Sequence, residues 1–317
     1  MKRRGFLAKG LLAFCGLLTT EQDAVSAETA SALFSVDQIK QHAPIIYLYS
    51  KEKYYPEDPM DFIRASRLRH HRKFWEDQGW NKEKNRFETG NSRAAKFYNI
   101  SLKTINSFKL HKSGKNRRPR DNNSGRDTDV FLQPEGARRG NRALHKVPVF
   151  YRTKKIKDKK DIDSVIQYWC FFGYNQSPVT VGPFGSFAHQ GDWEHVDIAF
   201  KGKNPIWVYF SAHGRSKKVK YKSAQKDKSG RVIAFAANGS HGMYSSKGKH
   251  TVKEDVALGY KHSFTDIANA GTAWDLSRKL ADLTIQPWKD FAGAWGEVGQ
   301  FAGTTGPLGP YLKNISY

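Results

Sequence analysis

Three side chains that commonly bind divalent cations lie within six residues of one another: His189, Asp192 and Glu194. Polar and apolar residues alternate over 193–200, which is typical of a strand with one buried face. Asp192 and Glu194 are two residues apart and therefore point to the same side, and His189 can fold back over them from a turn at Gly191. Such a group predicts a divalent cation, and its oxygen atoms favour magnesium, calcium or manganese over zinc. The alternative is a solvated strand face with a local ion pair.

Two further histidines are candidates for the same site. His213 follows a predicted strand and precedes a glycine, so it could reach the metal or act as a general base. Equally, a histidine at a strand end can cap backbone groups or face water. His241 lies between glycines that would allow a ligand to approach closely. We expect His213 and His241 to be catalytic only if the protein is an enzyme.

The composition predicts a folded protein with anionic partners. The chain has 317 residues, of which 38% are hydrophobic and 13% aromatic, enough for a substantial core. This excludes disorder throughout. Its formal net charge of +23 favours an anionic membrane surface, an acidic cell-wall polymer or glycan, or nucleic acid.

A basic insertion spans about residues 100–146, and its centre, 109–126, has no apolar periodicity. We expect this centre to be a flexible surface loop, either simply solvated or in contact with an anionic partner. The side chains that would make such a contact are basic, namely Lys109, Lys112, Lys115, Arg117, Arg118 and Arg120.

Residues 1–27 have the pattern of an export signal. Arg3 and Arg4 precede a weakly apolar run, and Val25-Ser-Ala27 is suitable for cleavage. The paired arginines resemble the twin-arginine signal, which exports folded proteins. We therefore expect a periplasmic or secreted protein without a transmembrane segment in its mature form. Its one remaining cysteine, Cys170, excludes an internal disulfide.

Short β-branched or aromatic segments, separated by turn residues, dominate the second half of the chain. These segments are Val147–Thr153, Ile162–Tyr174, Glu194–Phe200, Ile206–Ala212 and Val232–Ala237. Helices are expected at the periphery: a short one within 28–42, and two more over Asp58–Arg69 and Leu276–Leu283. The pattern predicts a mostly β fold: one domain over 28–317, with an antiparallel β-sandwich core, peripheral helices and long loops.

An ordered set of motifs resembles the bacterial and fungal relatives of the vacuolar protein sorting-associated protein sixty-two family. The set covers most of residues 43–310 apart from the basic insertion. Its members are Ala43-Pro44, Glu52-Lys-Tyr-Tyr-Pro56, Pro148-Val-Phe-Tyr151, Tyr168-Trp-Cys-Phe-Phe-Gly-Tyr-Asn175, Gly191-Asp-Trp-Glu-His195, Phe210-Ser-Ala-His213, Ala236-Ala-Asn-Gly-Ser-His-Gly-Met-Tyr244 and Trp288-Lys-Asp-Phe-Ala-Gly-Ala-Trp-Gly296.

The run Ala188-His-Gln-Gly-Asp-Trp-Glu194 more distantly resembles the signature heptapeptide of the necrosis- and ethylene-inducing-like toxins. These are metal-dependent β-sandwich cytolysins that recognise plant sphingolipid headgroups. The resemblance implies metal ligands at His189, Asp192 and Glu194, and places a later histidine of the family on His213. A further aspartate ligand of the family has only Asn175 as a counterpart, and Gly191 replaces the second histidine of the heptapeptide.

These observations predict an exported basic protein that uses a divalent-metal cleft to bind a lipid headgroup or a glycan, as a cytolysin-like toxin would. One alternative is a metal-dependent phosphodiesterase or nuclease, in which the same cation activates water and polarises phosphate. The other is a structural secreted protein in which the metal acts as a staple.

Overall fold

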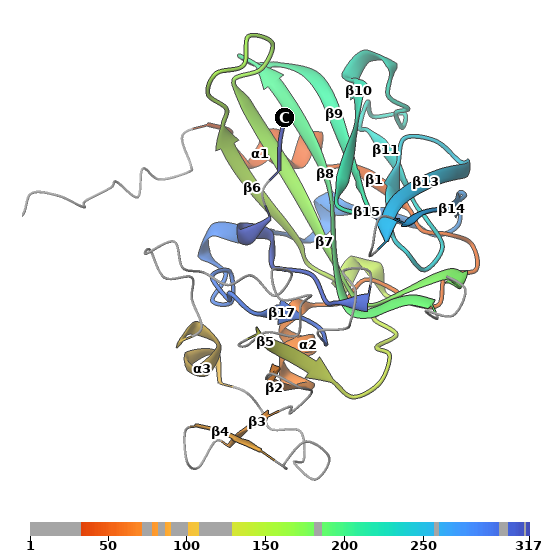
Figure 1. The fold of residues 1–317 in the computed structure, drawn as a ribbon. Helices are drawn as coiled ribbons and strands as arrows, with labels where there is room; N and C mark the ends of the chain where they lie inside the picture. Colours follow the sequence, from red (N-terminus) through yellow and green to blue (C-terminus); the bar gives the residue numbers. More distant parts are fainter. Residues whose placement is uncertain are drawn as a thin grey trace, which may run out of the picture.

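The computed structural model describes residues 33–71, 78–81, 86–89, 101–107, 129–180, 186–256, 260–297, 304–313 and 315–317. The expected mostly β fold is confirmed, and the described strands form four sheets (Figure 1). The export signal over 1–27 and the six basic side chains between Lys109 and Arg120 lie outside the described residues. Within the described part, no helix is long and apolar enough to cross a membrane.

A six-stranded sheet with the order β10-β9-β8-β7-β6-β16 forms the centre of the molecule. Its longest members, β7 and β8, make a hairpin in which Phe172 lies opposite Asp192. The strands are β6 (Val149–Lys155), β7 (Ser164–Thr180), β8 (Ser186–Lys201), β9 (Asn204–Ala212), β10 (Arg215–Lys220) and β16 (Leu280–Asp282). All neighbours are antiparallel except β16, which runs parallel to β6.

A four-stranded sheet with the order β12-β11-β1-β15 packs against one face of the central sheet. Its strands are β1 (Ile45–Tyr47), β11 (Ile233–Ala236), β12 (Met243–Tyr244) and β15 (Ala273–Asp275). Ile46, Ala234 and Trp274 lie in the same buried cluster as Phe172 and Val196 of the central sheet. These two layers form the predicted sandwich, although β1 and β11 pair in parallel.

Aromatic side chains cover the opposite face of the central sheet. Trp193 of β8 packs there with Trp288 and Trp295, and all three rings are buried. This layer also contains helix α2 (Pro59–Arg64) and a five-stranded sheet with the order β17-β5-β2-β3-β4. Its strands are β2 (Ser66–His71), β3 (Gln78–Asn81), β4 (Arg86–Thr89), β5 (Asp129–Pro134) and β17 (Ala294–Trp295). The strands β7 and β8 are therefore buried on both faces.

The remaining elements lie at the periphery. They are α1 (Val36–His42), α3 (Leu102–Ser107), the antiparallel pair β13 (Gly248–Val256) and β14 (Tyr260–Ala268), and the short 3-10 helices Leu144–Lys146, Tyr221–Ser223, Leu276–Lys279, Leu283–Ile285 and Pro310–Leu312. Within the basic insertion, α3 and β5 belong to the described structure, whereas residues 108–128 lie outside it.

The short helix expected within 28–42 is present as α1, but the helices expected over 58–69 and 276–283 are shorter in the structure. The first of these two ends at Arg64, because Ser66 begins a strand that pairs with β5. The second is only a 3-10 turn, after which Leu280 pairs with Val149 as part of β16. Leucines at positions 276, 280 and 283 fit a helix face, but pairing with β6 gives the same backbone groups partners in a sheet.

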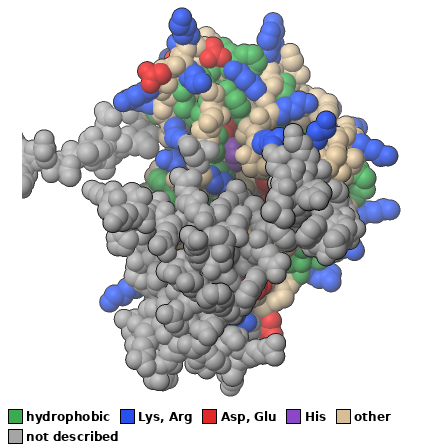
Figure 2. Space-filling view, viewed as in Figure 1, with side chains coloured by type: hydrophobic (Ala, Val, Ile, Leu, Met, Phe, Trp, Pro, Cys, Tyr) green, Lys and Arg blue, Asp and Glu red, His purple; other side chains and the backbone are tan. Residues whose placement is uncertain are grey.

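Positive charge is spread widely over the surface. Figure 2 shows Lys and Arg side chains projecting from the end that carries the β6–β7 and β8–β9 connections, with few Asp or Glu side chains among them.

Replacement of Trp295 by alanine should destabilise the fold by about 3–5 kcal/mol, because the fully buried ring contacts Trp193, Trp288 and Phe171. Urea unfolding measures this loss. Ile285→Ala is the matched control, since its side chain is 76% exposed and its loss should change stability little. Equal losses in the two variants would contradict the layer arrangement.

Candidate functional site

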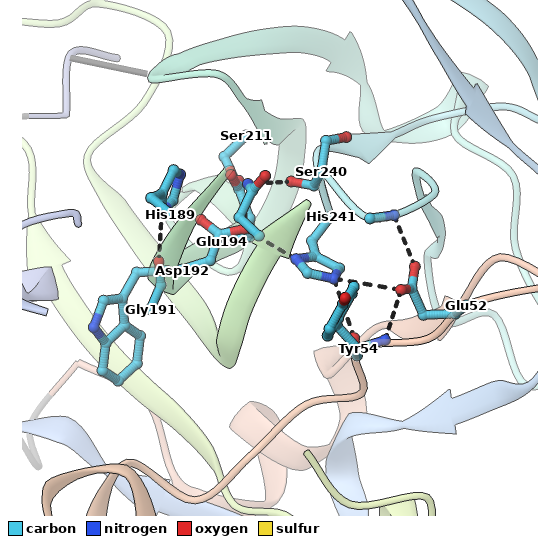
Figure 3. Close-up of polar contacts among 12 residues, drawn as sticks. Glu52, Tyr54, His189, Gly191, Asp192, Glu194, Ser211, Ser240 and His241 are labelled. Atoms are coloured by element: carbon cyan, nitrogen blue, oxygen red, sulfur yellow. Dashed lines mark hydrogen bonds and ion pairs between the residues drawn. The ribbon is translucent and has the colours of Figure 1, made fainter. Parts of the chain in front are cut away.

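The predicted metal-ligand residues occupy the first half of β8, where Gly191 bends the strand. Gly191 has a φ of 65°, and a Cβ atom there would lie 1.8 Å from the carbonyl oxygen of Trp295. A larger residue is thus excluded by both the backbone conformation and the close approach of β17. The bend directs the residues on its two sides, His189 and Asp192, into the same region (Figure 3).

Asp192 is buried and forms a charged hydrogen-bond network. Its Oδ2 atom accepts from the side-chain amide of Asn175 at 3.0 Å and lies 3.0 Å from Nδ1 of His241 (Figure 3). On the other side of the imidazole, Nε2 lies 3.1 Å from the Tyr54 carbonyl oxygen and 3.8 Å from Oε1 of Glu52. His241 therefore joins β8 to the 52–54 loop.

The surroundings of His241 favour its charged form. Burial alone would lower its pKa, but hydrogen bonds and ion pairs with Asp192 and Glu52 outweigh burial and raise the pKa to about 9. The ring stacks on Phe172 with a centroid distance of 3.8 Å. Its backbone has a φ of 56°, which is uncommon for a residue with a side chain. This buried cation holds the pKa of Asp192 below its usual value although burial opposes that shift.

Glu194 lies on the same face of β8 as Asp192, two residues further along the strand, and has different neighbours. Its Oε2 atom accepts a short hydrogen bond from the hydroxyl of Ser211, which in turn accepts from the backbone N–H of His195 at 2.7 Å. Burial, together with repulsion from Asp192, raises the pKa of Glu194 to about 8. Two carboxyl groups on one strand face thus differ in protonation at neutral pH.

His189 is oriented by a backbone contact. Its Nδ1 atom lies 2.8 Å from the carbonyl oxygen of Gly191, so Nδ1 carries the proton in the neutral ring. Burial lowers the pKa of His189 and favours this neutral form. The lone pair then belongs to Nε2, which is the arrangement found in histidines that bind metals.

The structure brings the other two predicted ligands into the same neighbourhood. Asn175 of β7 lies opposite His189 in the hairpin. His213 has a φ of 52°, and its Nε2 atom lies 2.8 Å from Oδ2 of Asp266. His213 is close enough to Glu194 for its charge to lower the pKa of that carboxyl group. Asn175 is hydrogen-bonded to Asp192, and His213 is paired with Asp266.

The donor set has the chemistry of a hard-cation site without being a closed one. The contacts described above use Oδ2 of Asp192, Oε2 of Glu194 and Nδ1 of His189. None of them uses the second donor atom of the same side chain. Outer partners that fix one atom of each ligand are typical of metal sites. Even so, no three His, Cys, Asp or Glu side chains within the described ranges are gathered as a metal site requires.

Sequence reasoning missed four residues of this neighbourhood: Glu52, Ser211, Asp266 and Lys313. Lys313 donates to the Trp193 carbonyl oxygen at 2.5 Å, and its charge lowers the pKa values of Asp192 and Glu194. Glu52 accepts from Gly239 N–H at 3.0 Å, although 187 residues separate them. No local spacing could have revealed contacts over such separations, although Glu52 belongs to one of the family motifs.

Comparison with known proteins supports the resemblance to the vacuolar protein sorting-associated protein sixty-two family. The chain is 26% identical over 321 residues to vacuolar protein sorting-associated protein 62 of Saccharomyces cerevisiae, covering 86% of this chain and 65% of that protein. It is 24% identical over 333 residues to the putative vacuolar protein sorting-associated protein TDA6 of the same yeast, covering 86% and 66%. The chain thus spans slightly less than two thirds of each relative. No family model matches it.

Among solved structures, the chain is similar to necrosis and ethylene inducing protein 2 from the causal agent of cocoa's witches' broom disease. The similarity covers 67% of this chain and 69% of that one, at 13% identity and a TM-score of 0.32.

The raised pKa values make stability fall with pH in the absence of divalent cations. Folded Glu194 holds its proton up to about pH 8, whereas the unfolded residue loses it near 4.5. The raised pKa of His241 stabilises the folded protein fully below about pH 6.5, and this stabilisation is lost as the pH rises through about 9. Both shifts therefore lower the free energy of unfolding between pH 5 and pH 9, by roughly a few kcal/mol.

Glu194→Gln should reduce that decline, because the amide stays neutral and keeps an acceptor for Ser211. Urea unfolding at several pH values in the presence of chelator measures the change, with exposed Glu135→Gln as control. If Glu194→Gln loses as much stability with rising pH as the parent protein, Glu194 is not the group that holds the proton.

Proposed function

We propose that this protein binds an anionic or glycosylated surface through a divalent cation held by His189, Asp192 and Glu194. When bound, calcium, magnesium or manganese would supply positive charge that bridges protein carboxylates to headgroup or sugar oxygens. Asn175 orients Asp192, and Ser211 orients Glu194, through the hydrogen bonds described above. A cytolysin-like outcome, membrane damage, belongs to the same proposal.

One observation supports this proposal above the others. Each of the three ligands is fixed through one atom, while the contacts that fix it leave its second donor atom unused. Hard cations such as magnesium usually take only one or two carboxylates from the protein and complete their shell with waters and substrate oxygens. An open set of donors suits a cation that must also hold a ligand from outside.

The proton on Glu194 gives the site a pH dependence. A carboxyl group must lose its proton before it can bind a cation, and burial beside Asp192 raises the pKa of Glu194 to about 8. Cation affinity should therefore rise between pH 6 and pH 8.

The positive charge of the chain, +23, supplies long-range attraction toward an anionic surface. Export through the signal over 1–27 would bring the protein to such surfaces outside the cytoplasm.

Replacement of either carboxylate should weaken cation binding at least tenfold. We expect Asp192→Asn and Glu194→Gln to lower the affinity for calcium, magnesium or manganese, because each removes an anionic ligand. Isothermal titration at pH 8 measures this loss. The control is Asp61→Asn, which removes a carboxylate that is 57% exposed in α2. Unchanged affinity in both site variants would reject the metal site.

The same cation should be needed for retention of the ligand. We expect immobilised glycans or lipid headgroups to retain the parent protein when the cation is present and to release it when chelator is added. The Glu194→Gln variant should not be retained under either condition. Hydrolysis of nucleic acid or of bis-nitrophenyl phosphate, abolished by chelator, would instead indicate the phosphodiesterase. Cation binding that raises the melting temperature without either activity would indicate the structural staple.

A further inference from the structure

Three connections of the central sheet bring lysines together at one end of the molecule. The β6–β7 loop, the β8–β9 turn and the end of β10 are neighbours, because the four strand pairs from β6 to β10 are antiparallel. We call this end the basic edge. It contains three aspartates, Asp158, Asp161 and Asp163, and eight lysines, Lys155, Lys157, Lys159, Lys160, Lys201, Lys203, Lys218 and Lys220.

The backbone of the basic edge is held in place by internal contacts. Ile162 of the β6–β7 loop is buried, and the Asp163 carboxylate accepts from Gly202 N–H at 2.8 Å, which ties the loop to the β8–β9 turn. Asp163 N–H also donates to the Phe200 carbonyl oxygen at 2.9 Å. The lysines therefore start from a fixed frame, and less entropy is lost on binding than for a disordered basic segment.

Two of the three aspartates are already occupied within the edge. Asp161 accepts from Nε1 of Trp207 at 2.8 Å and from Lys218 at 3.2 Å, while Lys218 also lies 4.1 Å from the Trp207 ring centroid. Asp163 accepts the hydrogen bond from Gly202 N–H in the β8–β9 turn. The remaining lysines of the two loops are exposed, and they dominate the charge that the edge presents to solvent.

The basic edge and the proposed metal ligands lie toward opposite ends of β8. Lys201 ends the strand, nine residues after Asp192. At about 3.3 Å per residue, this separation is about 30 Å. A contact at the edge can therefore form without the cation, and one flat surface that meets the edge end-on cannot also reach the metal ligands.

We propose that the basic edge is a docking surface for an anionic lipid bilayer, and that it acts independently of the metal ligands. The connections project from one end of the central sheet (Figure 1), where a flat partner can reach their lysines. Within the described part of the chain, the large hydrophobic side chains that are exposed are Val36, Ile267 and Ile285, none of them on the edge. Adsorption would thus be electrostatic and peripheral, without insertion.

This inference goes beyond the proposed function and narrows it. A protein docked through the basic edge holds His189, Asp192 and Glu194 away from the bilayer. The ligand of the cation would then be a group that extends from the surface, such as a glycan, or a soluble molecule. A lipid headgroup of the same membrane would be too close to the surface to reach the cation.

The test is binding of the full chain to phosphatidylcholine vesicles with and without phosphatidylserine, in chelator and at low salt. The edge variant carries Lys157→Gln, Lys159→Gln and Lys203→Gln, and we expect it to bind about a hundredfold more weakly, at roughly fivefold per lysine. The matched control carries Lys247→Gln, Lys249→Gln and Lys253→Gln, which removes the same charge from exposed sites around β13 and should bind nearly as the parent protein does.

Each other outcome overturns the inference. Equal losses in the two triple variants would mean that total charge alone drives adsorption. A deletion of residues 109–126 that abolishes binding would assign it to that segment. Tighter binding of the parent protein to duplex DNA than to the vesicles, with the same loss in the edge variant, would make nucleic acid the partner. Vesicle binding that requires the cation and fails in Glu194→Gln would refute the edge while supporting the proposed function.

Discussion

Burial of β7 and β8 on both faces is the constraint on which the rest of the structure depends. One face packs on the four-stranded sheet and the other on the tryptophan layer. A polar side chain on these strands therefore needs a partner inside the protein, because an unpaired buried polar group costs several kcal/mol. Asp192 and Glu194 meet this need on one face with His241 and Ser211. On the other face, Asp197 pairs with His195 at 2.7 Å and accepts from Tyr317 at 2.8 Å.

These partners come from distant parts of the chain. The hydrogen bonds that pair the buried polar side chains of β8 therefore also hold distant segments of the protein together. His241 belongs to a tight loop in which Gly239 has a φ of 67° and a Cβ atom would lie 2.1 Å from the Gln176 carbonyl oxygen. That loop is fixed to Glu52 through Gly239 N–H. The geometry around Asp192 is consequently set by a segment before β6, by β7 itself, and by a loop after β10. Changes in this loop should disturb the site without touching a ligand.

The sequence was sufficient for the features that local patterns encode. Alternation over 193–200 placed Asp192 and Glu194 on one face, and the strand-rich second half predicted the mostly β sandwich. It was not sufficient for the partners of these residues, since Glu52 and Lys313 reach the neighbourhood only through tertiary packing. Helix lengths were overestimated for the same reason: strand pairing at Ser66 and Leu280 is long-range, and the leucine spacing at 276–283 fits a helix equally well.

The balance of charge explains why the two carboxyl groups of β8 behave differently. Three buried carboxyl groups, on Glu52, Asp192 and Glu194, lie near the positive charges of His241 and Lys313, and His213 adds positive charge beside Glu194. His241 lies between Glu52 and Asp192 and keeps the pKa values of both low. Lys313 acts on Glu194 without preventing the rise of its pKa to about 8. Burial and repulsion from Asp192 therefore outweigh the nearby positive charges at Glu194, which holds a proton at neutral pH. Any cation that bound this carboxyl group would first have to displace that proton.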